Sequence, residues 1–264
     1  MKDKKYDHLS VRTSKQGVVT VTLDRKPENE LNRELIEELG MVFEHLSHDE
    51  QARAVVLTGA NGHFSSGADL KTFAELKPGA EFQRFSRLAI LAFDLISDLH
   101  IPVIAAISGR CLGGGNGLSM ACHFRIADTT ATFGQTNVRL GICPGFGGTQ
   151  RLAHRIGKSQ ALRICLSGDI IDAKEAARIG LVDLLVPKSK GALKEAEAMA
   201  AKIASYSKPV VSKIMELIVE GSGMPWQKGW AYEAAAFGEL SKLKDFQEGL
   251  ATFGKKRKPA FHDQ

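Results

Sequence analysis

The chain contains the stretch Pro102-Val-Ile-Ala-Ala-Ile-Ser-Gly-Arg-Cys-Leu-Gly-Gly-Gly-Asn-Gly-Leu-Ser-Met-Ala-Cys122. Its apolar run 102–107 predicts a buried strand with proline at the first position. Three glycines at 113–115 follow, and residues 116–122 are typical of a helix. The first N–H groups of a helix lack intrahelical acceptors, and glycine has no Cβ atom to keep a ligand away. This order predicts backbone N–H groups that bind a phosphate or stabilise an oxyanion, or else a tight turn packed against a neighbour.

The glycine spacing differs from that of nucleotide-binding loops. A P-loop would continue with Gly-Lys and then Ser or Thr, and the G-x-G-x-x-G motif would require glycine where this chain has Leu118. The spacing therefore favours an oxyanion site over a nucleotide site.

The composition is that of an ordinary soluble globular protein, with 264 residues, 44% hydrophobic and 25% charged. The net charge of +5 favours an anionic ligand without singling out nucleic acid. The amino-terminal residues lack the apolar segment of a signal peptide, and no apolar run approaches the roughly 20 residues of a membrane span. We therefore expect a cytoplasmic protein with no membrane partner.

The four cysteines, Cys111, Cys122, Cys143 and Cys165, occur in apolar surroundings and form no C-x-x-C pair. This pattern predicts reduced cysteines in the core, rather than disulfides or metal ligands. No metal is expected.

Over the rest of the sequence, the amino-terminal part alternates predicted strands with predicted helices, and the carboxyl-terminal part contains predicted helices alone. Strands 8–13 and 17–24 should form a hairpin, Asn32 should cap a helix, and a capping arrangement at 172–175 should open another that ends at Gly180. This order predicts an α/β core over residues 1–190 and a helical region over 191–264, where subunits could pack. Further strands are expected at 54–57, 124–127, 131–133 and 182–186, and further helices near 79–99 and 149–155.

Three stretches together resemble the crotonase, or enoyl-CoA hydratase/isomerase, superfamily. They are Phe64-Ser-Ser-Gly-Ala-Asp-Leu70, residues 109–122, and residues 133–151, which begin Phe-Gly-Gln-Thr-Asn and end Phe-Gly-Gly-Thr-Gln-Arg. Similarity at 173–182 and 245–259 extends the resemblance over nearly the whole chain, in the same order. The resemblance implies an α/β fold, namely a ββα superhelix with a helical C-terminal trimerisation region.

The resemblance also implies a chemistry. The substrate is an acyl-CoA thioester, so coenzyme A enters as part of the substrate and no separate cofactor is expected. Two backbone N–H groups hold the thioester enolate, and by motif position they belong to Ala68 and Gly114. The protein is expected to form a homotrimer or a dimer of trimers, and no nucleic-acid partner is expected.

The family also supplies candidate positions for binding the CoA portion. Ser66, Leu70 and Lys71 match positions that line the adenine pocket. Lys256, in the basic tail, matches a lysine near the CoA phosphates, although such a charge run is most often a solvated tail.

The chain departs from the hydratase pattern where the two usual glutamates would stand, because these positions hold Gly117 and Asn137. Hydration needs one group to activate water and another to handle the proton at the α-carbon. Neither glycine nor a neutral amide supplies these functions, and isomerases need the second glutamate as well. Related naphthoyl-CoA synthases and aryl-CoA dehalogenases use aspartates at positions that are Pro144 and Gly145 here.

Other polar residues near these motifs have weaker claims. A single histidine near a pocket is more often structural than catalytic, and we assign His63 and His123 accordingly. Asp69 is expected to cap or brace its loop. Cys111 and Cys143, as apolar cysteines, are expected to pack in the core.

The leading hypothesis is an acyl-CoA enzyme of the hydratase/isomerase type with a backbone oxyanion hole. One alternative is a decarboxylase of a β-carboxyacyl-CoA, because loss of CO₂ forms the enolate without a base, and Asn137 could orient the carboxylate. Another is a non-catalytic acyl-CoA-binding protein. The sequence leaves the acyl group open.

Overall fold

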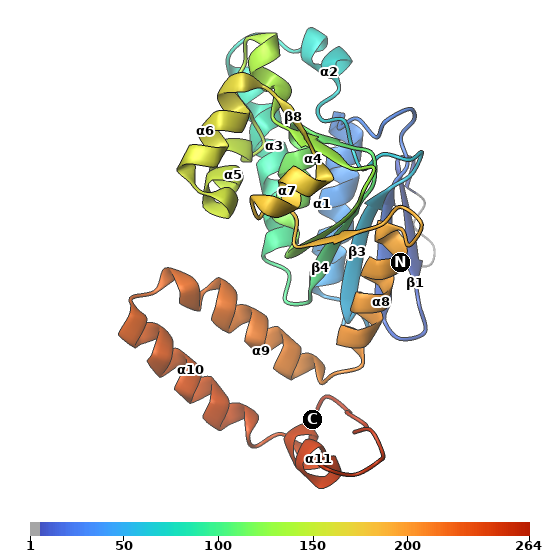
Figure 1. Cartoon of the computed structure of the whole chain (residues 1–264), viewed down its shortest axis with the longest axis vertical. Coiled ribbons are helices and arrows are strands. Elements are labelled where there is room, and N and C mark those ends of the chain that lie inside the picture. Colours follow the sequence, from blue (N-terminus) through green and yellow to red (C-terminus); the bar gives the residue numbers. More distant parts are fainter. Residues whose placement is uncertain (1–5) are drawn as a thin grey trace.

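The computed structural model describes residues 6–264, and its larger sheet has the strand order β1-β2-β3-β4-β6-β9 (Figure 1). The hairpin of β1 and β2 is antiparallel, with Leu9 opposite Leu23, and every other pair in this sheet is parallel. The strands are β1 (Leu9–Thr13), β2 (Val18–Leu23), β3 (Ala54–Gly59), β4 (Val103–Ile107), β6 (Phe124–Asp128) and β9 (Leu184–Val186).

The smaller sheet carries the glycine-rich segment. It has the order β5-β7-β8, formed by β5 (Arg110–Leu112), β7 (Thr132–Gly134) and β8 (Ile170–Asp172). The chain leaves β4 through Gly109, whose φ of 58° favours glycine, and then enters β5 and α4 (Gly114–Ala121). Strand, strand and helix in this order form one turn of the expected ββα superhelix, which the structure confirms.

Helices cover both faces of the larger sheet, which explains why β4 is apolar and buried at every position. On one face, α1 (Arg33–Ser47) and α3 (Ala80–Ser97) enclose the main core. On the other, α8 (Ala192–Ala204) lies directly on the sheet. Its alanines recur at four-residue spacing and therefore form one flat face that permits close approach; they are Ala192, Ala196, Ala200 and Ala204.

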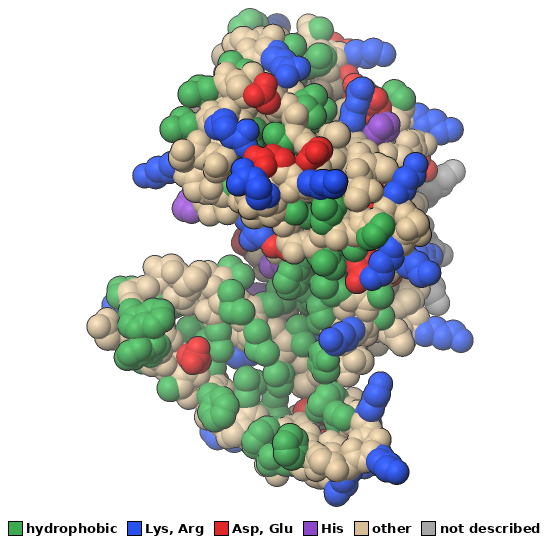
Figure 2. Space-filling model, viewed as in Figure 1, with side chains coloured by type: hydrophobic (Ala, Val, Ile, Leu, Met, Phe, Trp, Pro, Cys, Tyr) green, Lys and Arg blue, Asp and Glu red, His purple; other side chains and the backbone are tan. Residues whose placement is uncertain are grey.

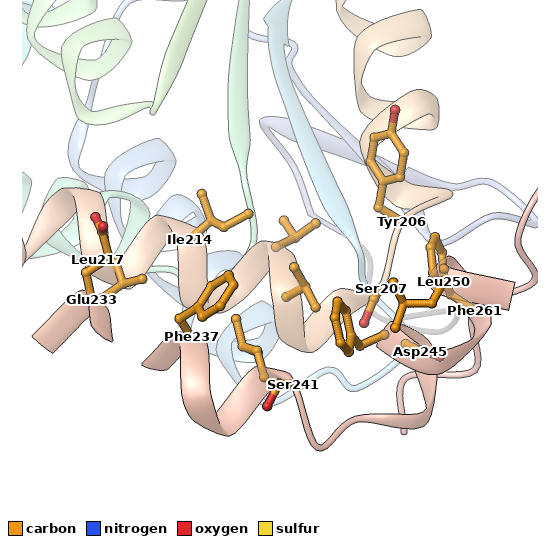
Figure 3. A pocket seen from close by; sticks show the side chains of 15 residues that line it. Tyr206, Ser207, Ile214, Leu217, Glu233, Phe237, Ser241, Asp245, Leu250 and Phe261 are labelled. Atoms are coloured by element: carbon orange, nitrogen blue, oxygen red, sulfur yellow. The ribbon is translucent and has the colours of Figure 1, made fainter. Parts of the chain in front are cut away.

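The last three helices form an extension at the end of the molecule away from α2 (Leu70–Glu75) (Figure 1). They are α9 (Lys208–Val219), α10 (Trp226–Leu240) and α11 (Lys244–Thr252). Apolar side chains gather on this extension (Figure 2), and Trp226 and Phe237 are more than 70% exposed. A largely apolar groove of about 620 Å³ lies between the three helices (Figure 3).

Most of the predicted elements are confirmed. Asn32 caps α1, since its Oδ1 accepts the N–H of Leu35 at 3.0 Å. Asp172 caps α7 (Ala173–Arg178) by accepting the N–H of Glu175 at 2.8 Å.

Other expectations need correction. The helix after the glycines begins at Gly114, two residues before the predicted start, and β5, β8 and α6 (Lys158–Ser167) were not predicted. Cys143 is exposed rather than packed in the core, because residues 142–145 form an irregular segment at the surface. The remaining short helices are α5 (Gly148–Ile156) and the 3₁₀ helices η1 (Thr136–Leu140) and η2 (Gly221–Gly223).

Over residues 6–264, no helix is long and apolar enough to cross a membrane. The same residues contain no group of three or more His, Cys, Asp and Glu side chains placed to hold a metal ion.

Candidate active site

The loop that carries Ala68 is fixed from both sides. Ser65 pairs with Cys111 of β5, and Leu31 pairs with Ala68. In the second pairing, the N–H of Leu31 donates to Gly67 O at 2.7 Å, and Leu31 O accepts the N–H of Asp69 at 3.1 Å. Because neighbouring residues of an extended chain direct their backbone groups to opposite sides, the N–H of Ala68 faces away from Leu31.

Gly114 supplies the second N–H group as the first residue of α4. The N–H of Gly113 donates to Gly134 O at 2.9 Å, and that of Gly117 donates to Gly113 O at 3.0 Å. The N–H of Gly114 has no acceptor within the helix. Among the backbone hydrogen bonds of the described residues that lie outside helices and strands, none is donated by the N–H of Gly114 or by the N–H of Ala68.

Glycines allow the two loops to touch. A Cβ atom on Gly67 would lie 2.9 Å from Leu112 O and 3.3 Å from the nitrogen of Gly114. One on Gly115 would lie 2.4 Å from Ser65 O. Real Cβ atoms do not approach backbone oxygens this closely, so glycine is required at both positions for the loops to meet.

Ala68 and Gly114 line the same pocket, of about 220 Å³, and Asn137 also faces it. The structure therefore brings together three of the positions selected from the sequence. Among the other lining residues, the sequence singled out only Cys143, as a packing residue, and Gly145, as a position where a related family uses aspartate. The lining residues that it missed are Phe73, Phe82, Gln83, Phe85, Ser86, Ile142 and Phe146.

Asn137 offers an unsatisfied polar group at the pocket. It lies in η1, and its Oδ1 is buried without a hydrogen-bond partner among the described residues. A buried acceptor without a partner costs about 1–3 kcal/mol, so this oxygen would gain from a ligand group that donates a hydrogen bond. Among the described residues, 6–264, those that line this pocket include no carboxylate and no imidazole side chain.

Gly117 lies behind Phe146 rather than on the pocket wall. It follows Gly114 by three residues and therefore shares its face of α4. A Cβ atom on Gly117 would lie 3.6 Å from Phe146 O and 3.7 Å from Cε2 of Phe93. The ring of Phe146 covers Gly114 on the same face, and Gly117 is not among the residues that line the pocket.

Comparison with known proteins identifies the family. The family model described as enoyl-CoA hydratase/isomerase matches residues 13–264. The chain belongs to the enoyl-CoA hydratase/isomerase family. It is 36% identical over 246 residues to a probable enoyl-CoA hydratase of Bacillus subtilis, covering 93% of this chain and 95% of that protein.

Two further relatives agree with this assignment. The short-chain-enoyl-CoA hydratase of Clostridium acetobutylicum is 36% identical over 252 residues, 94% of this chain and 96% of that protein. The crystal structure of an enoyl-CoA hydratase from Bacillus anthracis superposes with a TM-score of 0.92 at 36% identity, covering 98% of this chain and all of that one. The expected crotonase fold and an enzyme of the enoyl-CoA hydratase/isomerase type are thereby confirmed.

The positions that this family resemblance suggests for CoA fall into two groups. Ser66 is half-buried beside Ala68, while Leu70 and Lys71 are exposed at the start of α2. Lys256 is exposed and follows α11, and α11 lies at the opposite end of the molecule from α2 (Figure 1). A single chain therefore does not bring Lys256 to the other three.

Asp69 braces the Ala68 loop, as predicted. It is buried, it caps α2 by accepting the N–H of Lys71 at 2.9 Å, and it pairs with the Arg25 guanidinium at 2.5 Å. Its carboxylate is thus engaged in holding the loop.

Neither histidine faces the pocket. His63 Nδ1 accepts the N–H of Arg110 at 3.1 Å, and His123 Nδ1 accepts that of Val103 at 3.0 Å. Burial lowers the pKa of His123 to about 4, so its ring is neutral at physiological pH. Both observations agree with the structural role expected from the sequence.

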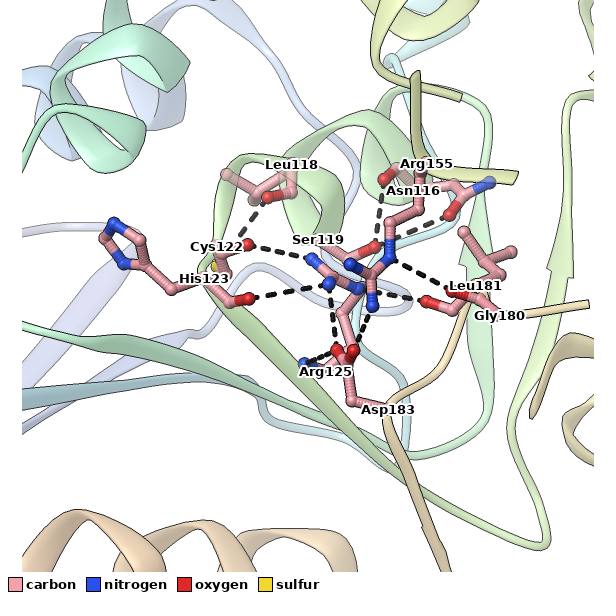
Figure 4. A network of polar contacts seen from close by, with 10 residues as sticks. All are labelled: Asn116, Leu118, Ser119, Cys122, His123, Arg125, Arg155, Gly180, Leu181 and Asp183. Atoms are coloured by element: carbon pink, nitrogen blue, oxygen red, sulfur yellow. Dashed lines mark hydrogen bonds and ion pairs between the residues drawn. The ribbon is translucent and has the colours of Figure 1, made fainter. Parts of the chain in front are cut away.

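The far end of α4 is anchored by buried Arg125 (Figure 4). Its guanidinium donates to Cys122 O at 2.8 Å, to Leu181 O at 3.0 Å and to the Asp183 carboxylate at 2.8 Å. Arg155 also pairs with Asp183. This network ties the C-terminal end of α4 to the segment 181–183 that leads into β9.

Proposed function

We propose that this protein binds an acyl-CoA thioester with its carbonyl oxygen at the N–H groups of Ala68 and Gly114, and stabilises the enolate formed there. The observation that carries the proposal is that Ala68 and Gly114 line one pocket and that neither N–H donates to a backbone carbonyl among the described loop and turn contacts. Fixed donors of this kind stabilise developing negative charge strongly, because they need no reorganisation during the reaction. The family membership supports a CoA thioester as the group that is held.

A second candidate is decarboxylation of a β-carboxyacyl-CoA, favoured by the neutral lining of the pocket. In this reaction the bond to the carboxylate breaks and its electron pair forms the enolate, so no protein base is needed. Asn137 lines this pocket, and its side-chain NH₂ group would donate to the leaving carboxylate. Solvent would then supply the proton to the α-carbon. Hydration by the usual route needs two glutamates, and this chain has Gly117 and Asn137 at their positions.

Turnover of a panel of thioesters tests these candidates. Crotonyl-CoA reports hydration through loss of the enoyl absorbance, and malonyl- and methylmalonyl-CoA report CO₂ release. Ala68→Pro removes one N–H donor and should lower any turnover by about 10²- to 10³-fold, while Ala68→Ser, which keeps the N–H, should retain most of it. Binding without turnover of any substrate would instead indicate a non-catalytic acyl-CoA-binding protein.

We further propose that the apolar groove of α9, α10 and α11 packs against other copies of the chain in a trimer or a dimer of trimers. Its lining is almost entirely apolar, and contiguous exposed apolar surface commonly marks an interface. Light scattering of the wild type should give three or six copies. Phe237→Glu should reduce that number, and an unchanged assembly would count against this face.

A further inference from the structure

Phe146 adopts a backbone conformation that is uncommon for an aromatic residue. Its φ is 55°, in the left-handed region, between Gly145 and Gly147. Such strain persists only where surrounding contacts impose it, and it concentrates at ligand-binding sites. Here the buried ring packs edge to face on Phe85, at 5.4 Å between centroids, and on Phe93, at 6.3 Å. The ring position is therefore fixed.

This ring forms one wall of the pocket. Phe73 and Phe82 face the same space, with centroids 5.3 Å apart, and Phe73 packs edge to face on Phe85 at 6.1 Å. The four rings thus form a continuous aromatic lining. Phe146 is the member that lies against Gly114, and so it stands beside a proposed donor to the thioester oxygen.

The volume of the pocket limits what fits against these rings. The pocket measures about 220 Å³. An apolar cavity of about 150 Å³ accommodates benzene. With the thioester carbonyl at Ala68 and Gly114, the remaining space suits a group about the size of a six-membered ring.

We infer that Phe146 is a specificity-determining residue that restricts the substrates to thioesters of compact acyl groups and excludes long fatty acyl chains. The inference rests on the proposed function, because that function places the thioester carbonyl beside Gly114. A chain that continued past Gly114 in this direction would meet a ring that Phe85 and Phe93 hold in place.

Isothermal titration calorimetry with saturated thioesters tests this inference. Because these thioesters have no double bond to hydrate, the measurement reports binding alone. Butyryl-CoA and cyclohexanecarbonyl-CoA should bind the wild type about tenfold or more tightly than dodecanoyl-CoA does. Phe146→Ala should remove most of this difference by strengthening dodecanoyl-CoA binding. Phe146→Leu, a smaller change that is easier for the core to accept, should give an intermediate ranking.

Phe43→Leu is the matched control, since Phe43 is fully buried in α1 and does not line the pocket. It should keep the wild-type ranking. Two results would overturn the inference: wild type that binds dodecanoyl-CoA as tightly as cyclohexanecarbonyl-CoA, or a folded Phe146 variant with an unchanged ranking. If the wild type bound none of the three thioesters, the proposed function itself would fail, and this inference with it.

Discussion

A Cβ atom on Gly114 would lie 2.8 Å from Cδ2 of Phe146, whereas one on Gly117, on the same face of α4, would have no neighbour closer than 3.6 Å. The two glycines therefore differ in the space available to a side chain. Gly114 is required by the ring that packs on it, and Gly117 has room for a methyl group. An alanine substitution should therefore have a different effect on stability at each position.

Gly114→Ala should lower the free energy of unfolding by about 1–3 kcal/mol through overpacking against the Phe146 ring. Gly117→Ala should be neutral or stabilise by up to about 1 kcal/mol, because alanine favours the helix interior. Urea unfolding measures both. Combining Gly114→Ala with Phe146→Leu should restore part of the loss, and strictly additive effects would argue against contact between the two residues.

Restoring the two missing glutamates should not by itself restore hydration. A glutamate at position 117 would extend toward the Phe146 carbonyl and the Phe93 ring, where a carboxylate is poorly solvated. Gly117→Glu with Asn137→Glu should therefore gain little activity on crotonyl-CoA. Adding Phe146→Ala should raise hydration by about 10²-fold or more, as expected for acid–base groups that reach the substrate.

Phe146→Ala alone is the control for this series and should gain no hydration. Loss of the enoyl absorbance is the measurement in every case. Rapid hydration by the double variant with Phe146 intact would show that the ring does not separate position 117 from the pocket.

Protonation of His123 should destabilise the protein at low pH. Its pKa in the folded state is lowered to about 4 by burial, and nearby Arg125 contributes further. The unfolded chain binds this proton at about pH 6.5, so between these two values the unfolded state holds more protons and stability falls as pH falls. From pH 7 to pH 5, His123 should cost about 2 kcal/mol.

Urea unfolding at the two pH values tests this, with His123→Asn as the comparison. The Asn amide oxygen can accept the Val103 N–H in place of Nδ1, and it does not titrate. The variant should therefore lose about 2 kcal/mol less than the wild type over this pH range. Equal losses in both proteins would assign the pH dependence to other groups.

The backbone features of the site could be predicted because they follow from local sequence. Consecutive glycines before a helix predict a free N–H at its start, and the structure places that start at Gly114. The capping roles of Asn32, Asp69 and Asp172 were also predictable, because each depends on a neighbour within three residues.

Features that depend on tertiary contact were not predictable in the same way. Strands β5 and β8 are defined by their pairing with β7, which brings together segments distant in the sequence. Helix α6 leaves Leu162 and Leu166 exposed, so its apolar positions do not mark a buried face. Phe146 left one signal, a large apolar residue within Gly-Phe-Gly-Gly, but its contact with Gly114 exists only in the folded chain.

Infrared difference spectroscopy of butyryl-CoA labelled with ¹³C at the thioester carbonyl reports on hydrogen bonding to that oxygen without turnover. On binding to the wild type, the carbonyl band should shift to lower wavenumber. The shift should persist in Asn137→Ala, whose side chain does not hold the carbonyl, and should shrink in Ala68→Pro, which lacks one donor. A bound thioester with an unshifted band, or an equal shift in Ala68→Pro, would contradict the assignment of Ala68 and Gly114 as the oxyanion donors.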